Sequence, residues 1–161
     1  MNESTLILGL GNTLLTDEAV GIEVIRRLEA DNDLTGVSFL DGGTLSFTLA
    51  APIADCSQLI VVDAARMDQV PGTVKVFEDE AMDRQLSGKG KSVHEVSLAD
   101  LMDMARLSDT LPRRRALVGV EPAEVDWGDV LTSTVEAAVP SAMEAVRTLI
   151  ARWSAESKPK A

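Results

Sequence analysis

Aromatic side chains are scarce in this sequence of 161 residues, which contains three Phe, two Trp and no Tyr. A hydrophobic core must therefore be mainly aliphatic. Hydrophobic residues nevertheless make up 45% of the chain, which is enough for one domain with a core and argues against a disordered protein. We expect a single α/β domain over residues 1–153 and a disordered polar tail over residues 154–161.

Cysteine is nearly absent. Because Cys56 is the only one, neither a disulfide framework nor a cysteine-based zinc site can form within one chain. No apolar run reaches the roughly 18 residues of a membrane span. The first residues, MNESTLILGL, lack the basic segment and the long apolar run of a signal peptide. We therefore expect a cytoplasmic protein without a membrane partner.

Basic residues are outnumbered, with 15 Lys and Arg against 26 Asp and Glu, and the formal net charge is −11. Nucleic acids and anionic lipids bind clustered Lys and Arg, so neither is an expected partner. The densest basic stretch, Arg113–Arg115, precedes an apolar run and is interpreted as the solvated start of a strand. A cationic or metal-bearing partner suits the charge better.

Short apolar runs alternate with helical patterns along the chain, which predicts a largely parallel sheet with helices on both faces. The apolar runs predict strands over 5–10, 37–40, 59–62 and 116–120, with an edge strand over 73–77. Apolar residues at helical spacing predict helices over 18–30, 44–55, 97–107 and 134–153. The polar segment 79–95 is expected to be a long loop.

The first strand leads into Gly9-Leu-Gly11, which matches half of a dinucleotide-binding glycine motif. Leu14 stands where the third glycine belongs. Asp17 and Glu18 stand at the start of the following helix, where they would repel a pyrophosphate. Thr16 or Asp17 is expected to cap this helix. A nucleotide-binding enzyme with a degenerate glycine loop therefore remains only as an alternative.

Three potential metal ligands come from separate segments. Glu18 lies at the first helix, Asp63 follows the strand 59–62, and His94, the only histidine, lies in the long loop. Each has an ordinary explanation, since acids favour helix starts and strand ends and a lone histidine is usually structural. Together they form a nitrogen and oxygen site of the type that suits nickel, zinc or iron. Three ligands without a thiolate indicate a metal shared with, or delivered by, a substrate.

Several motifs resemble the NiFe-hydrogenase maturation endopeptidases, over residues 5–150 of the chain. The resemblance is carried by G-x-G-N-x-L-x-x-D-E from Gly9 to Glu18, D-G-G-T from Asp41 to Thr44, V-D-A from Val62 to Ala64, P-G-T from Pro71 to Thr73, S-V-H-E from Ser92 to Glu95 and V-G-V-E-P from Val118 to Pro122. The family fold implies a three-layer α/β/α sandwich whose five-stranded sheet has one antiparallel strand. Segment 73–77 is the candidate for that strand.

The resemblance implies that Glu18, Asp63 and His94 form the metal site and the catalytic centre. The implied reaction removes the C-terminal peptide of a hydrogenase large-subunit precursor after nickel insertion, and the nickel is carried by this substrate. The metal, or one carboxylate acting as a base, would activate water, and a paired-carboxylate mechanism of the aspartic type with Asp17 or Asp63 as the base is the rival. Gly42, Gly43 and Thr44 are expected either to contact the substrate or to form a plain turn and helix cap. A non-catalytic chaperone of a nickel protein is a further alternative.

Overall fold

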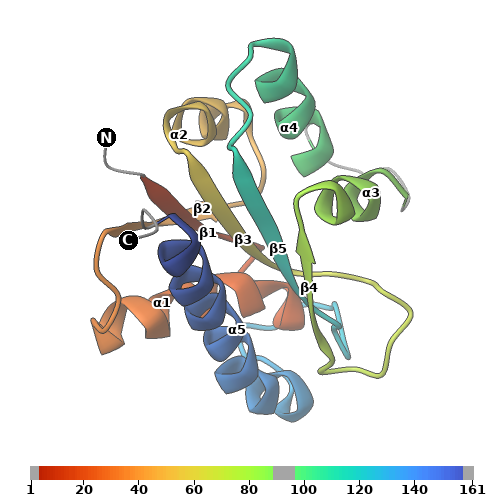
Figure 1. The fold of residues 1–161 in the computed structure, drawn as a ribbon. Helices are drawn as coiled ribbons and strands as arrows, with labels where there is room; N and C mark the ends of the chain where they lie inside the picture. Colours follow the sequence, from red (N-terminus) through yellow and green to blue (C-terminus); the bar gives the residue numbers. More distant parts are fainter. Residues whose placement is uncertain (1–3, 89–96, 158–161) are drawn as a thin grey trace.

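The computed structural model describes residues 4–88 and 97–157, which form one five-stranded sheet in the order β2-β1-β3-β5-β4 (Figure 1). The strands are β1 (Thr5–Leu10), β2 (Val37–Gly43), β3 (Gln58–Ala64), β4 (Val74–Glu78) and β5 (Arg114–Val120). Neighbouring strands are parallel except for β4, which pairs antiparallel with β5 at the edge. The predicted mixed sheet with one antiparallel edge strand is confirmed.

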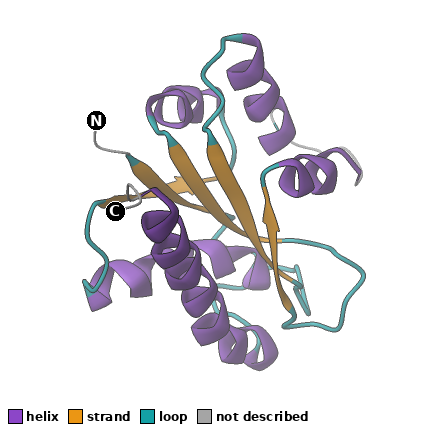
Figure 2. Ribbon diagram, in the orientation of Figure 1, coloured by secondary structure: helices purple, strands orange, loops and turns teal. Residues whose placement is uncertain are grey.

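Helices cover both faces of the sheet (Figure 2). Helices α1 (Val20–Asp31) and α5 (Ser133–Ser157) pack on one face, and α2 (Ala50–Asp55), α3 (Glu80–Gly88) and α4 (Leu98–Leu107) pack on the other. Two short 3₁₀ helices, η1 (Thr16–Ala19) and η2 (Phe47–Leu49), precede α1 and α2. None of these helices is long and apolar enough to cross a membrane.

The alternation of strand side chains builds two aliphatic cores. On β3, Ile60 and Val62 face α1 and α5, whereas Leu59 and Val61 face the other helical layer. All four are fully buried, as expected for a central parallel strand. Among the described residues, Trp153 is the one aromatic side chain buried in these cores, and Phe39 and Phe77 pack against them partly buried, so the mainly aliphatic core expected from the composition is confirmed.

Several boundaries differ from the sequence-based predictions. Strand β2 runs through Asp41 to Gly43, although this triplet was expected to end it, and β3 includes Asp63. Helix α5 continues to Ser157, so the first part of the predicted tail is helical, and residues 158–161 lie outside the described part. Packing extends α5, because the Arg114 guanidinium lies over the buried Trp153 ring and pairs with Glu156.

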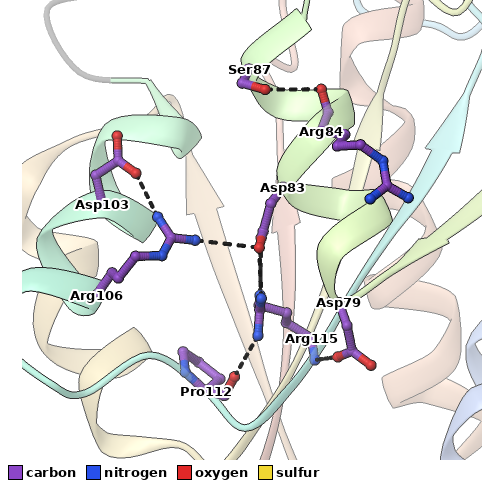
Figure 3. Close-up of polar contacts among 8 residues, drawn as sticks. All are labelled: Asp79, Asp83, Arg84, Ser87, Asp103, Arg106, Pro112 and Arg115. Carbon is purple, nitrogen blue, oxygen red and sulfur yellow. Dashed lines mark hydrogen bonds and ion pairs between the residues drawn. The ribbon is translucent and has the colours of Figure 1, made fainter.

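The prediction of one loop over 79–95 is wrong for its first part, because residues 80–88 form helix α3. Met82 anchors it in the core. Asp83 accepts two hydrogen bonds from Arg115 of β5, at 3.0 and 2.6 Å, and contacts Arg106 of α4 (Figure 3). Arg115 is therefore a largely buried partner of α3 rather than a solvated strand start. The rest of this segment, 89–96, lies outside the described residues.

Substitution of Asp83 by Asn should destabilise the protein by about 2 kcal/mol, because it leaves the Arg115 guanidinium without its carboxylate. The pKa of Asp83 is lowered chiefly by its hydrogen bonds with Arg115, so this loss should shrink as the pH falls toward the acid range. Urea unfolding at pH 7 measures the effect. Asp103→Asn is the matched control, because Asp103 makes only an exposed pair with Arg106 and its loss should cost little.

Candidate functional site

A pocket of about 240 Å³ opens at the carboxyl edge of the sheet, beside the ends of β1, β2 and β3. Its walls come from segments far apart in the sequence: Gly11 and Glu18 after β1, Gly43 and Thr44 at β2, and Asp63 of β3. In a parallel sheet this edge is the usual position of a ligand site. The pocket therefore brings together four of the residues predicted for the site: Glu18, Gly43, Thr44 and Asp63.

Two half-buried carboxylates, Glu18 and Asp63, face the pocket. They meet there because β1 and β3 are adjacent parallel strands, with Gly9 in register with Val62. The pKa of Asp63 is raised to about 7, chiefly by burial and secondly by the neighbouring Glu18 charge, against the lowering effect of the Ala64 backbone. Negative charge on both carboxylates is therefore unfavourable in this pocket, and a bound cation would stabilise it.

Two glycines allow the Glu18 segment to lie this close to the strand ends. Gly11 has φ +144°, and a Cβ there would lie 1.8 Å from the Glu18 carbonyl oxygen. A Cβ on Gly21 would lie 2.1 Å from the Val62 carbonyl oxygen. The Gly11 N–H also donates to the Gly43 carbonyl at 2.9 Å, which ties the loop to β2. These glycines serve the packing of η1 and α1 against the sheet.

Asp17 is not a helix cap, contrary to the sequence-based prediction. It is fully buried and accepts hydrogen bonds at 2.8–3.0 Å from four donors: the backbone N–H groups of Ala123, Glu124 and Thr132 and the Thr132 hydroxyl. The Thr16 hydroxyl also bonds the same loop, at the Glu124 carbonyl and the Asp126 N–H. Neither η1 nor α1 has a side-chain cap. Asp17 instead fastens the β5–α5 loop, residues 121–132, to the segment that carries Glu18.

Only part of the segment predicted to bind substrate, residues 42–44, lines the pocket. Gly43 and Thr44 line the pocket, but Gly42 does not, because a Cβ at Gly42 would point at the Leu8 and Leu10 side chains, 2.8 Å away. Thr44 does not cap the next helix either, since η2 begins only at Phe47. Substrate contact by these residues stays a prediction.

His94 lies outside the described residues, in the segment between α3 and α4. Within residues 4–88 and 97–157, no group of three or more His, Cys, Asp and Glu residues is placed to hold a metal ion. The described part of the chain thus contributes two carboxylates, and the three-ligand metal site remains a prediction.

Sequence reasoning left out several residues that line the pocket, among them Leu45, Arg66, Pro122 and Val125. Arg66 comes three residues after Asp63. This closeness to the end of a predicted strand was the signal that could have assigned Arg66 to the site. Buried Glu121 supports this region, because it accepts hydrogen bonds from Met67 and Gln69 in the β3–β4 loop. Cys56 lies in the core, where burial raises the pKa of its thiol to about 11, so it is an inert packed residue.

The fold and the acidic pocket place the chain in a known class of enzyme. A family model described as hydrogenase maturation protease matches residues 22–149. The chain therefore belongs to the hydrogenase maturation protease family and is a hydrolase of the peptidase class.

Among its relatives, the hydrogenase 2 maturation protease of Escherichia coli K12 is 36% identical over 157 residues, which cover 96% of this chain and 95% of the relative. The hydrogenase expression/formation protein HupD of Rhizobium leguminosarum is 32% identical over 150 residues, covering 92% and 74% of the two chains. The solved structure of the hydrogenase maturating endopeptidase HybD from E. coli superposes with a TM-score of 0.84 at 34% identity, over 92% and 93% of the chains.

Substitution of Asp63 by Asn should stabilise the protein increasingly as the pH rises from 4 to 8. The folded-state pKa of Asp63, about 7, exceeds the ordinary value of about 3.9, so the folded state holds this proton more tightly and loses stability as the pH rises through that interval. At pH 8 the variant should melt about 5 °C above the wild type. Thermal unfolding across this pH range is the measurement, and a difference independent of pH would contradict the assignment.

Substitution of Asp17 by Asn should lower the free energy of unfolding by about 2 kcal/mol, because an amide group turns an N–H donor toward the donors of residues 123–132. Urea unfolding measures this loss. The control is Asp129→Asn, an exposed residue of the same loop, which should unfold like the wild type. Unchanged stability of Asp17→Asn together with lost processing would instead assign Asp17 a role as a catalytic base.

Proposed function

We propose that this protein is an endopeptidase that removes the C-terminal peptide of a NiFe-hydrogenase large-subunit precursor after nickel insertion. One observation supports this above the others: Glu18 and Asp63 line a single pocket at the carboxyl edge of the sheet in a chain of the hydrogenase maturation protease family. Processing would take place in the cytoplasm, and neither nucleic acid nor membrane would take part.

The recognition element in this proposal is the nickel that the precursor carries. Glu18, Asp63 and His94 would complete its coordination with oxygen and nitrogen ligands, which suit a divalent metal of this kind. The pKa of Asp63, raised chiefly by burial and secondly by the neighbouring Glu18 charge, supports the binding of a cation there. The net charge of −11 is also compatible with a partner that presents a metal ion.

The nickel would place the scissile peptide bond beside the carboxylates, and water would attack its carbonyl carbon. Asp63 would take the proton from this water through the carboxylate oxygen that does not bind the nickel, and would pass it to the leaving amine nitrogen as the peptide C–N bond breaks. Polarisation of the water by the nickel is the other route. Asp17 is less suited as a base, since its two oxygens already accept hydrogen bonds from the β5–α5 loop.

The decisive experiment incubates the protein with nickel-loaded and with nickel-free precursor and follows the precursor mass. Loss of the C-terminal peptide from the nickel-loaded form alone is expected. Cleavage of both forms would disprove nickel recognition. Binding without any cleavage would favour the chaperone alternative, and affinity for NAD or ATP with no effect on either precursor would favour the nucleotide alternative.

Removal of any predicted ligand should stop processing while the fold survives. We expect Glu18→Gln, Asp63→Asn and His94→Ala each to lower the cleavage rate by at least about 100-fold, since each removes a contact to the nickel. Circular dichroism would verify the fold. Asp55→Asn is the matched control, because Asp55 is an exposed carboxylate at the end of α2, directly before β3 and thus at the opposite edge of the sheet.

A further inference from the structure

Exposed apolar side chains gather at the carboxyl edge of the sheet. Among the described residues, nine large hydrophobic side chains are exposed, and only Val76, Met104 and Leu107 lie in strands or helices away from this edge. The other six exposed hydrophobic residues lie in the segments that follow β1, β2, β3 and β5: Leu14, Phe47, Val70, Val125, Trp127 and Val130. Apolar exposure concentrated on one edge marks an interaction surface.

Trp127 is the largest of these side chains and is 78% exposed. It lies in the β5–α5 loop, which can be followed in Figure 1 between the end of β5 and the start of α5. The same loop contributes Val125 to the wall of the acidic pocket. The exposed tryptophan and the site of Glu18 and Asp63 are thus parts of one continuous edge.

The loop is fixed rather than loosely attached. The Gly128 N–H donates to the Leu14 carbonyl, and the Thr16 N–H donates to the Gly128 carbonyl, both at 2.9 Å. Asp17 holds the loop again on either side of Trp127, at residues 123–124 and at Thr132. A preorganised exposed aromatic side chain loses little conformational entropy on binding, which is typical of an interface anchor.

The charged residues of this loop all have one sign. The sequence contains no Lys or Arg between Arg115 and Arg147, and in E-V-D-W-G-D-V, residues 124–130, exposed acids alternate with exposed apolar residues. Two copies of such a surface would place acids against acids, which disfavours self-association. The complementary partner is a protein surface with apolar side chains and Lys or Arg around them.

We propose that Leu14, Val125, Trp127 and Val130 form a docking surface for the folded body of the precursor, with Trp127 as the anchor and the flanking acids facing basic residues of the precursor. This inference rests on the proposed function and extends it, because it assigns affinity for the substrate to a surface beside the pocket. The carboxylates then act on the nickel and the scissile bond, and the docking surface supplies binding that does not depend on them.

The test compares steady-state cleavage of nickel-loaded precursor by the wild type and by Trp127→Ala. We expect KM to rise about tenfold while kcat stays within about twofold, because the contact is made equally in the bound substrate and in the transition state. Leu107→Ala is the control: Leu107 is 89% exposed but ends α4, away from the site, and its loss should change neither constant. Asp129→Lys should raise KM at low salt, whereas the exposed Glu29→Lys on α1 should not.

A direct binding measurement separates this inference from the proposed function. The Kd of the precursor for Asp63→Asn, which should not cleave it, is compared with that for Asp63→Asn combined with Trp127→Ala. A tenfold weaker Kd supports the docking surface even if the wild type proves to be a chaperone that cleaves nothing. If Trp127→Ala changes neither the Kd nor the KM, the docking surface is disproved, whereas the peptidase function is not affected. If the wild type is a dimer and Trp127→Ala is a monomer, the inference is also disproved, because a second copy of this chain would then cover the surface in place of the precursor.

Discussion

The buried carboxylate of Asp17 holds the functional edge of this protein together. Its two oxygens accept hydrogen bonds from donors between residues 123 and 132, and the segment that carries it also carries Glu18. A buried charge of this kind is tolerated only when several donors surround it. The segments that follow β1 and β5 are thereby connected at the carboxyl edge of the sheet. Both segments contribute to the wall of the pocket.

A second constraint is the adjacency of β1 and β3, which brings Glu18 and Asp63 to one pocket. Asp63 would have an ordinary pKa if it stood alone at the surface. Burial first, and the neighbouring Glu18 charge second, raise the pKa of Asp63 to about 7, and a cation in the pocket would offset both effects. The same arrangement that costs folding stability thus supports the proposed binding of substrate nickel.

The proposed docking of the precursor body and the proposed action on its nickel and scissile bond involve different side chains. Glu18 and Asp63 lie in the pocket, whereas Trp127 lies outside it on a loop with no basic residue. Asp17 connects the two, because it fixes the loop of Trp127 to the segment of Glu18. An acidic pocket next to an acidic and apolar surface suits one protein partner that brings both a metal ion and a complementary face.

The sequence by itself determined the alternation of strands and helices, the aliphatic core and the placement of acids at the carboxyl edge. These follow from local periodicity: Leu98, Leu101, Met102 and Ala105 repeat at helical spacing and are indeed buried. Only the tertiary structure decided that residues 80–88 are helical, since Asp83 needs Arg115 from a distant strand. It also decided that Asp17 binds a loop more than a hundred residues away rather than capping its own helix. Such partners are set by how the strands are ordered in the sheet, and no local pattern encodes that order.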